Sequence, residues 1–361
     1  MTLADEAVDL SRIHRLADFE IAARATLDPA AYDYIAGGAW DEDSVAENEA
    51  AWRRRTLRPR VLVDVADVTT ATTLLGVPSS MPVAIAPTAT HGLAHPDGEP
   101  ATARAAAAAG IPFILSTMSS RTIEEVAEAI PDATRWFQLY AQAEPRRTRR
   151  LVDRAVAAGY GAIVLTVDLP VLGYRERDRR NAFIPGPFGN FADEADEPEE
   201  GVDWLSRSLT WDDLATIRGW APGLPLVLKG ILGAEDARLA VEHGVDAIVV
   251  SNHGARQLDR VAAPVDVLEE VVDAAGGRTE IWVDGGVRRG LDVAIALALG
   301  ARGVLLGRPT LWALATGGQA GVERAIAILR AELEITLALL GAPSVADLTR
   351  AHVTPVSRGS A

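Results

Sequence analysis

The segment 251–259, which reads Ser-Asn-His-Gly-Ala-Arg-Gln-Leu-Asp, places a histidine and an arginine three residues apart, His253 and Arg256. Arginine can hold a carboxylate through two parallel hydrogen bonds, and histidine can accept a proton near neutral pH. The pair can therefore address one small anion, with Arg256 on its carboxylate and His253 facing the adjacent carbon. Asp168, much earlier in the chain, is an acid that can orient His253 or balance its charge.

The chain contains six histidines, and His253 is the only one that directly follows an apolar run. His91 and His95 flank an earlier loop. The sequence His95-Pro96-Asp97 is typical of a helix entry, with proline near the first helical position. We therefore interpret His91 and His95 as structural residues.

Lys229 is the only lysine in a chain with 35 lysines plus arginines. Surface cations are freely exchangeable, so a general drift towards arginine would have removed a lysine that needed only to be positive. Lys229 also follows the apolar run Leu226–Leu228 directly. Its position indicates a site that needs a compact ammonium rather than a broad guanidinium. The alternative interpretation is an exposed lysine that survived by chance.

Eight short apolar runs recur along the chain, and each is followed by a stretch compatible with a helix. Strands that are apolar throughout are typical of a parallel sheet buried on both faces, and eight such strands close a barrel. We therefore predict an α/β fold, a (β/α)8 TIM barrel. An open doubly wound sheet is the alternative, weakened by the absence of a G-x-G-x-x-G turn after the first strand. The predicted strands are 83–86, 113–115, 136–139, 163–167, 226–228, 248–250, 281–283 and 304–306, and the helical segments include 99–109, 123–130, 148–158, 234–242, 265–274 and 291–299.

Polar residues or glycines end every one of these runs. In a barrel of this kind, active sites are built at the carboxyl ends of the strands. A purely structural protein needs no such ring, so its recurrence at all the strand ends predicts an active site. In chain order the ends are Pro87-Thr88-Ala89, Ser116-Thr117, Gln138 with Tyr140, Thr166 with Asp168, Lys229, Ser251 to Gly254, Asp284 to Gly286, and Gly307-Arg308.

The last two strand ends combine glycines with arginines. They read Asp-Gly-Gly-Val-Arg-Arg-Gly at 284–290 and Gly-Arg-Pro at 307–309. Glycine lets the backbone approach a phosphate, and the loops after the seventh and eighth strands are the habitual phosphate site of this fold. The two segments predict a phosphorylated substrate or cofactor. Two glycine turns with incidental arginines are the alternative.

Two regions supplement the barrel, which we assign to residues 66–361. Residues 1–65 are mostly helical in pattern, with apolar residues at helical spacing in 13–27 and a second helix that opens at Asp28-Pro29, and they predict a small N-terminal cap. The connection 169–209 after the fourth strand is much longer than an ordinary βα loop. We expect it to be a lid and to be disordered. Its acidic run 193–200 is most simply a solvated surface.

Composition excludes several classes of function. A net charge of −15 disfavours a nucleic-acid partner, because phosphate binding needs a basic field. The chain has no cysteine, which excludes disulfides and cysteine-based metal sites and fits a reducing cytoplasm. We predict no metal site. Neither a long uncharged apolar run nor the apolar core of a signal peptide is present, so we expect neither a membrane partner nor export.

These segments together resemble the FMN-dependent 2-hydroxy-acid oxidase/dehydrogenase family over about residues 31–348. The most specific match is the segment 251–259. The resemblance implies a (β/α)8 barrel, FMN as the cofactor, and oxidation of an (S)-2-hydroxy acid to the 2-oxo acid, with reoxidation by O2 giving H2O2. It also implies a homo-oligomer, either a tetramer or an octamer. Further matches in order are Tyr32-Asp33-Tyr34, Ala86 to Ala89, Phe137 to Tyr140, Leu165 to Asp168, Leu228 to Gly230 and Asp284 to Arg288.

The resemblance implies a role for each site residue. His253 would take the proton, Asp168 would stabilise the imidazolium that results, and Tyr140 would bind the substrate hydroxyl. Lys229 would lie by the flavin N1 and O2, where its charge stabilises the anionic reduced ring. The substrate carboxylate would be bound by Tyr34, Arg175 and Arg256. The other implied cofactor contacts are Pro87, Thr88, Ala89, Ser116, Gln138, Thr166 and Ser251 at the flavin, and Asp284, Gly285, Gly286, Val287, Arg288, Gly307 and Arg308 at the phosphate.

Some positions depart from the pattern of the glycolate-oxidising members of this family. Met118 stands where a bulky tryptophan narrows their pocket, and flexible methionine can admit a longer or aromatic side chain. Tyr174 replaces an arginine beside Arg175. Three other activities stay open: a dehydrogenase that passes electrons to a quinone or carrier protein, a decarboxylating monooxygenase, and a flavin-dependent modifying enzyme of a biosynthetic pathway.

Overall fold

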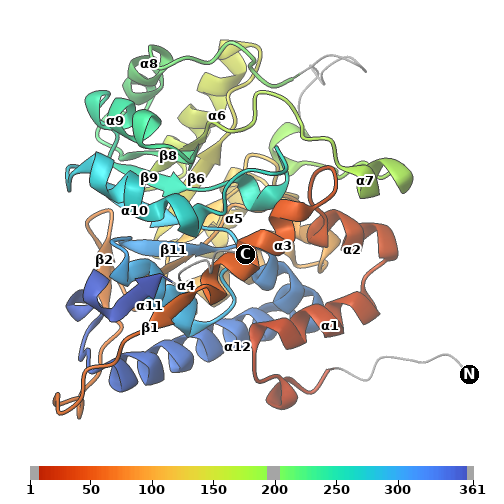
Figure 1. Cartoon of the computed structure of the whole chain (residues 1–361). Helices are drawn as coiled ribbons and strands as arrows, with labels where there is room; N and C mark the ends of the chain where they lie inside the picture. The colour runs from red at the N-terminus through yellow and green to blue at the C-terminus, as the bar shows by residue number, and fades with distance from the viewer. Residues whose placement is uncertain (1–7, 193–203, 356–361) are drawn as a thin grey trace, which may run out of the picture.

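The structure is a computed structural model that describes residues 8–192 and 204–355. Within these residues, eight parallel strands form a closed barrel in which β4 to β11 follow one another and β11 pairs with β4 (Figure 1). Each predicted apolar run forms one of these strands, so the (β/α)8 prediction is confirmed. The strands are β4 Val83–Ile85, β5 Phe113–Leu115, β6 Arg135–Leu139, β7 Ile163–Thr166, β8 Leu226–Ile231, β9 Ala247–Val250, β10 Glu280–Val283 and β11 Gly303–Leu306.

Burial on both faces explains why the strand sequences are apolar throughout. Every residue of β7, β9 and β11 is buried. Inside the barrel, the rings of Trp136 and Trp282 meet edge to face with centroids 5.3 Å apart, in a cluster that includes the small residues Ala84, Ala162 and Ala247. The interior is therefore a packed core rather than a pore, and a ligand has to bind at one end of the barrel.

Helices alternate with the strands and surround the barrel (Figure 1). The predicted helical segments are confirmed as α4 Gly98–Ala109, α5 Ile123–Ala129, α6 Pro145–Ala157, α9 Ala234–Glu242, α10 Pro264–Ala275 and α11 Gly290–Ala298. Two further helices that the sequence pattern did not single out are α8 Asp213–Trp220 and α12 Arg308–Leu340. The backbone of α12 is non-helical at Gly317 and Gly318. Among the described residues, no helix is both long and apolar enough to cross a bilayer.

Three helices precede the barrel: α1 Leu16–Thr26, α2 Pro29–Ala36 and α3 Asp43–Arg53. Asp28 caps α2 by accepting hydrogen bonds from the amides of Ala30 and Ala31, and Pro29 occupies the first turn, where no amide donor is needed. In Figure 1, α1 runs alongside α12. Strand β1 Arg55–Leu57 pairs with β12 Val353–Pro355 in a separate two-stranded sheet, which joins this region to the segment that follows α12. The division of the chain at residue 65 stays a prediction.

The long connection after β7 contains a short helix, α7 Glu176–Arg180, which the sequence pattern did not predict. Arg177 on α7 forms ion pairs with Asp33 on α2 and with Glu42, and Asn181 donates a hydrogen bond to Asp33. We call residues 169–209 the lid. The acidic run 193–200 lies outside the described residues. The remaining elements are the hairpin β2 Thr72–Leu74 and β3 Val77–Ser79, and the 3-10 turns η1 Leu10–Arg12, η2 His91–Leu93, η3 Gly189–Phe191, η4 His253–Ala255, η5 Val345–Asp347 and η6 Arg350–His352.

Candidate active site

A cavity of about 640 Å³ lies at the carboxyl ends of the barrel strands, walled by strand-end loops, by α2 and by the lid. Most residues that the sequence predicted for the site line it: Tyr34, Pro87, Thr88, Ala89, Tyr140, Arg175, Lys229, His253, Arg256, Asp284, Gly285, Gly286, Val287, Arg288, Gly307 and Arg308. The other five do not line it: Ser116, Gln138, Thr166 and Ser251 are buried, and Asp168 is partly buried. Asp168 bonds His253, Ser251 bonds Lys229, and Ser116, Gln138 and Thr166 bond one another.

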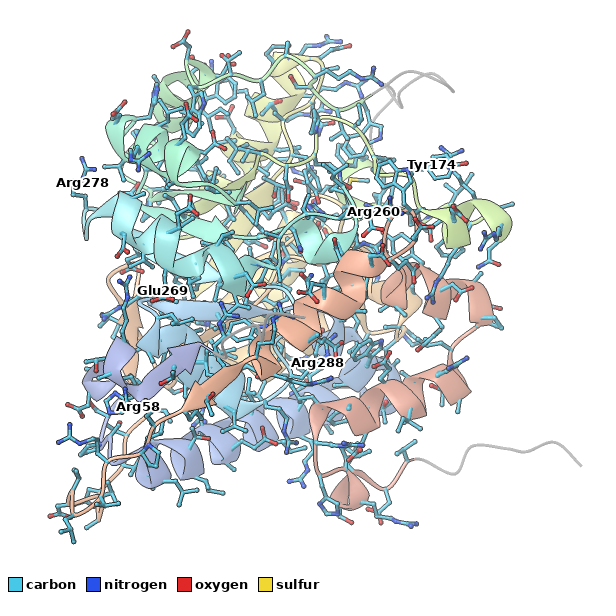
Figure 2. The ribbon with its side chains drawn as sticks, in the orientation of Figure 1. Arg58, Tyr174, Arg260, Glu269, Arg278 and Arg288 are labelled. Atoms are coloured by element: carbon cyan, nitrogen blue, oxygen red, sulfur yellow. The ribbon has the colours of Figure 1, made fainter. Side chains whose placement is uncertain are left out.

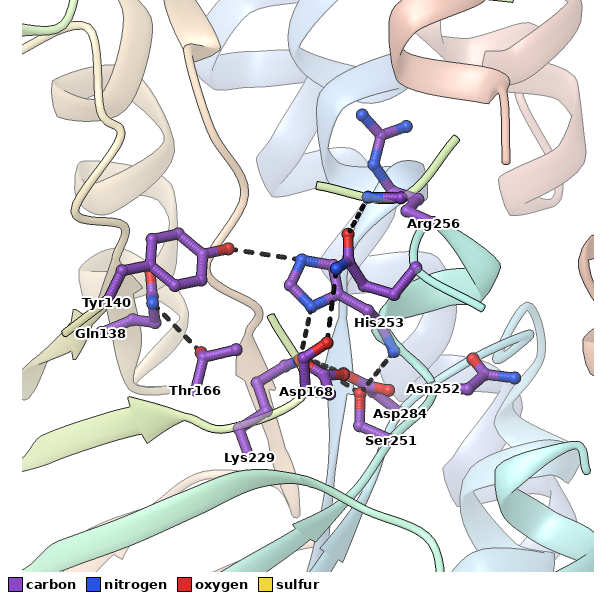
Figure 3. A network of polar contacts seen from close by, with 12 residues as sticks. Gln138, Tyr140, Thr166, Asp168, Lys229, Ser251, Asn252, His253, Arg256 and Asp284 are labelled. Atoms are coloured by element: carbon purple, nitrogen blue, oxygen red, sulfur yellow. Dashed lines mark hydrogen bonds and ion pairs between the residues drawn. The ribbon is translucent and has the colours of Figure 1, made fainter. Parts of the chain in front are cut away.

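His253 stands between an acid and a phenol. Its Nδ1 lies 2.8 Å from Asp168 Oδ1, and its Nε2 lies 3.3 Å from the Tyr140 hydroxyl (Figure 3). Gly230, on β8, permits the contact: its φ is +115°, and a Cβ there would lie 2.6 Å from Asp168 Cβ and Cγ. The aspartate therefore orients the imidazole through one nitrogen and leaves the other towards the cavity.

The environment keeps this pair in a reactive charge state. Burial lowers the pKa of His253 below its usual range, and the charge and hydrogen bond of Asp168 only partly oppose that effect. Burial raises the pKa of Asp168, but the contacts with His253 and the charge of Lys229 outweigh it, so the net pKa is lowered. At neutral pH the site therefore holds a neutral imidazole next to a carboxylate, which is the state that a general base requires. Burial raises the pKa of Tyr140, so its phenol keeps its proton.

The single lysine of the chain is buried in this site. Lys229 Nζ lies 3.1 Å from Asp284 Oδ2 and donates a 2.9 Å hydrogen bond to Ser251 Oγ (Figure 3). Ser251 Oγ in turn accepts the backbone amide of His253 at 3.1 Å. The alternative of an exposed lysine that survived by chance is therefore wrong. Lys229 is therefore a buried cation paired with a carboxylate, at the position where the sequence indicated a compact ammonium.

Arg308 is a buried cation held by backbone carbonyls. Its Nε donates to Ile35 O at 3.0 Å and its Nη2 to Gly37 O at 2.7 Å, both at the carboxyl end of α2. Within the described residues, no carboxylate lies within ion-pair distance of its guanidinium. Burial, with the nearby charges of Arg256 and Arg288, lowers the pKa of Arg308 to about 9. A buried cation without a formal counter-charge is costly, so this position favours a bound anion.

Arg256 and Arg175 form a second cationic group closer to His253. Arg256 Nη1 donates to Tyr34 O at 2.5 Å and to Gly37 O at 3.0 Å, and its guanidinium lies over the Tyr34 ring, 4.7 Å from the centroid. Arg175 Nε donates to Arg256 O at 3.1 Å. Burial, and then the charge of Arg256, lower the pKa of Arg175 to about 10. Neither arginine has a carboxylate partner among the residues that the structure describes. The two arginines therefore provide a place for a second small anion.

The loop after β10 is shaped by α3. Gly285 and Gly286 have φ values of +87° and +79°, and a Cβ on Gly286 would lie 2.0 Å from Asn48 O. Trp52 Nε1 donates to Gly285 O at 2.9 Å. The glycines are thus needed so that the loop can pass close to α3. Arg288 extends from this loop, and unlike Arg308 it has a carboxylate partner, Glu49, at 2.8 Å.

Three of the predicted site residues at the ends of β5, β6 and β7 carry uncharged polar side chains. Ser116 Oγ donates to Gln138 Oε1 at 3.2 Å, and Gln138 Nε2 donates to Thr166 Oγ1 at 3.1 Å. All three side chains are buried. They form a chain of hydrogen bonds that needs no charge to be stable in the interior.

The lid contributes cavity residues that the sequence did not identify, including the apolar Leu172, Phe183, Ile184, Phe188 and Trp204 and the acid Asp178. They follow no strand end and belong to no motif, so no local signal marks them. Met118, which stands where the glycolate-oxidising members of the family have a tryptophan, lines the cavity. Tyr174 does not line it: its side chain lies outside, near α7, against Trp40 and under Arg179 (Figure 2).

Comparison with known proteins places this architecture in a family. The family model described as FMN-dependent dehydrogenase matches residues 23–355. An L-lactate oxidase from Nostoc sp. is 47% identical, over 92% of this chain and 96% of the relative. A glycolate oxidase from Spinacia oleracea is 46% identical, over 93% of this chain and 94% of the relative. A solved structure of a mandelate oxidase is 42% identical, with a TM-score of 0.89 and coverage of 95% of this chain and 98% of its own. The chain therefore belongs to the FMN-dependent dehydrogenase family.

Proposed function

We propose that this protein is an FMN-dependent oxidase that converts an (S)-2-hydroxy acid to the 2-oxo acid and passes the electrons to O2, giving H2O2. The observation that carries the proposal is the position of a neutral base, His253 on Asp168, beside two arginines that lack a carboxylate partner within the described part of the chain. Oxidation of a 2-hydroxy acid requires both kinds of group: a cation that binds the carboxylate and a base that accepts a proton. Relatives named as lactate and glycolate oxidases support the same substrate class.

The residues of the site fit FMN. Arg308 is a buried cation without a counter-anion in the described structure, and it adjoins Arg288 and the glycines after β10, so these groups would hold the phosphate. Lys229 would lie beside the flavin ring, and bound FMN would supply an acceptor for two electrons. Pro87, Thr88, Ala89, Asp284, Val287 and Gly307 line the cavity. Ser116, Gln138 and Thr166 hydrogen bond to one another, Ser251 hydrogen bonds to Lys229, and we propose all of these residues as cofactor-binding.

Oxidation of a 2-hydroxy acid removes the hydroxyl proton and the Cα hydrogen together with two electrons. We propose that Arg256 and Arg175, with Tyr34, bind the substrate carboxylate, and that Tyr140 binds its hydroxyl. His253 then takes a proton at Nε2, the nitrogen that faces Tyr140. Asp168 stabilises the resulting imidazolium through Nδ1. The fixed charge of Lys229 offsets the negative charge that the cofactor gains.

Apolar residues in the cavity wall favour a substrate with an apolar side chain. Met118 lines the cavity, together with the lid residues Leu172, Phe183, Phe188 and Trp204. Apolar walls stabilise an aromatic or long aliphatic group more than the hydrogen atom of glycolate. We also propose that the protein acts in the cytoplasm as a homotetramer or octamer, as the sequence analysis implies.

A panel of acids tests the function. FMN-loaded protein is mixed without oxygen with glycolate, L-lactate, (S)-mandelate and a long-chain 2-hydroxy acid, and the bleaching of the flavin is followed. Air is then admitted and H2O2 is measured. Rapid bleaching followed by stoichiometric H2O2 supports an oxidase. Rapid bleaching with slow reoxidation by O2 and fast reoxidation by a quinone would instead indicate a dehydrogenase. A protein that binds no FMN would remove the basis of the proposal.

A further inference from the structure

His91 is a buried histidine next to the cavity that the chemistry above does not use. Its Nε2 lies 2.6 Å from Oγ1 of Thr88, which lines the cavity. Its Nδ1 lies 2.9 Å from Oγ1 of Thr102 on α4. The residue is 1% exposed, and its ring meets Phe113 edge to face. The histidine thus forms a bridge between a helix outside the barrel and a hydroxyl at the cofactor cavity.

The imidazole is held from its backbone side as well. The amide of His91 donates to Glu99 Oε1 at 2.9 Å, and the amide and hydroxyl of Ser120 also donate to this carboxylate, at 2.8 and 2.6 Å. Glu99 is fully buried, and in the described part of the chain no cation pairs with it. One carboxylate therefore fastens the loop after β4, which carries Thr88 and His91, to the loop after β5.

The contact distances fit one assignment of the hydrogen-bond roles of the His91 ring. A neutral imidazole has one N–H donor and one acceptor nitrogen, and burial lowers the pKa of His91, which keeps it neutral. N–H donors usually lie about 2.9–3.0 Å from an oxygen, whereas hydroxyl donors approach more closely. The longer contact therefore fits Nδ1–H donating to Thr102, and the shorter one fits the Thr88 hydroxyl donating to Nε2. In this arrangement the Thr88 proton points away from the cavity.

We propose that His91 is a positioning residue, which fixes the Thr88 hydroxyl so that its oxygen presents only hydrogen-bond acceptor sites to the bound FMN. The inference rests on the FMN of the proposed function and does not depend on which acid is oxidised. A threonine hydroxyl otherwise rotates and can donate or accept. An oxygen that can only accept binds a cofactor state that offers it an N–H group more tightly than a state that does not. His91 therefore sets both the affinity for FMN and its reduction potential.

The test compares single and double variants by FMN titration of the apoprotein and by spectroelectrochemical measurement of the bound FMN, neither of which needs turnover. His91→Leu should weaken FMN binding about 3- to 10-fold, the size of one hydrogen bond, and should shift the reduction potential. Thr88→Val should cause a shift of the same sign and similar size. The double variant should add nothing further, because both substitutions remove the same interaction. His91→Gln, whose amide can still accept from Thr88, should restore most of the wild-type values.

Two further variants keep the test decisive. Thr102→Val removes the partner of Nδ1 without changing the volume much, so it should shift the potential in the same direction even where His91→Leu folds poorly. His95→Leu alters the neighbouring histidine, which hydrogen bonds to the amide of Asp97 and does not line the cavity, and should leave both values unchanged. Additive effects of His91→Leu and Thr88→Val, or an unchanged potential in folded His91→Leu protein, would overturn the proposal. Failure of the wild type to oxidise any acid would not affect this result.

Discussion

The two halves of the barrel mouth differ in charge. Except for Asp168 and the lid residue Arg175, the site residues after β4 to β7 are uncharged, and Ser116, Gln138 and Thr166 satisfy one another in one hydrogen-bonded chain. The ends of β8 to β11 carry Lys229, the His253 and Arg256 pair, Asp284, Arg288 and Arg308. Paired neutral groups can be buried at little cost, whereas unpaired cations favour a ligand that brings negative charge. The comparison suggests that the first half shapes a surface for the cofactor and the second half performs the chemistry.

Asp168 crosses this division. It follows β7 in the first half, yet its carboxylate contacts His253, which follows β9. The strand ends of the first half thus contribute one charge, that of Asp168, and it is directed at the base. Substitutions in the charged half should therefore change rates strongly, and substitutions in the uncharged half should change specificity or cofactor properties more gently.

The largest effect should follow from His253→Gln. We expect the variant to keep FMN and to bind a carboxylate inhibitor, because the arginines are intact, but to lose about 10²–10⁴-fold in the rate of flavin reduction without its base. Stopped-flow reduction of the FMN-loaded variant measures this. His243→Gln is a matched control, since His243 stacks on Trp211 and does not line the cavity. Near-native reduction in the His253 variant would contradict the assignment of the base.

Arg256→Lys should be the next most harmful change although it keeps the charge. The planar fork that can hold a carboxylate with two hydrogen bonds is replaced by a point charge. We expect a loss of roughly 2–4 kcal/mol in kcat/KM, as for a desolvated charged pair. Steady-state kinetics over a range of ionic strength provides the measurement, with the exposed Arg278→Lys as control. A change in salt sensitivity alone would place Arg256 at the rim of the site.

Lys229→Met should lower the reduction potential of FMN and slow its reduction about 10- to 100-fold, the size of one charge-assisted interaction. The reason is that the negative charge on the cofactor loses its buried counter-charge, while Asp284 stays in place 3.1 Å from the former ammonium. Potentiometry and stopped-flow kinetics on the same FMN-loaded sample test both effects. Unchanged values in both experiments would show that the single lysine has only a structural role.

Asp168→Asn should change the pH dependence of kcat/KM. The base must be neutral, so activity falls as the pH drops through the pKa of His253, which burial already lowers. The charge of Asp168 raises that pKa, so its removal should move the acid limb of the profile to lower pH while the maximal rate falls. A shift of the limb towards higher pH would mean that Asp168 does not act on His253 as a carboxylate.

Met118→Trp should have the smallest effect on catalysis. It tests the half of the barrel mouth after β4 to β7, in which most site residues are uncharged. A larger ring at this position fills the part of the cavity that would take the substrate side chain. The ratio of kcat/KM for glycolate over mandelate should rise about 10-fold or more. Equal effects on both acids would show that Met118 does not face the substrate.

Much of this molecule could be predicted from local sequence because the fold imposes local rules. A strand buried on both faces must be apolar along its whole length, as Ile163 to Thr166 nearly is, and a glycine often follows where a helix ends, as Gly110 does after α4. The residues that end each strand then meet at one end of the barrel, whatever the loops do. From these rules alone, the sequence predicts that His253, Lys229 and Arg308 share one site, and all three line the cavity.

Tertiary structure decided which of these residues touch. Asp168 and His253 are 85 residues apart and meet because the barrel closes and Gly230 leaves space between them. His91 was interpreted as merely structural, since nothing in the sequence shows that its ring reaches Thr88. The sequence did not predict α7 in the lid either, and Arg177 on α7 pairs with Asp33 and Glu42, which lie far away in the sequence. Local sequence determined the strand ends, because burial acts residue by residue. The pairing of charges required the folded chain, because it depends on distances that no sequence spacing encodes.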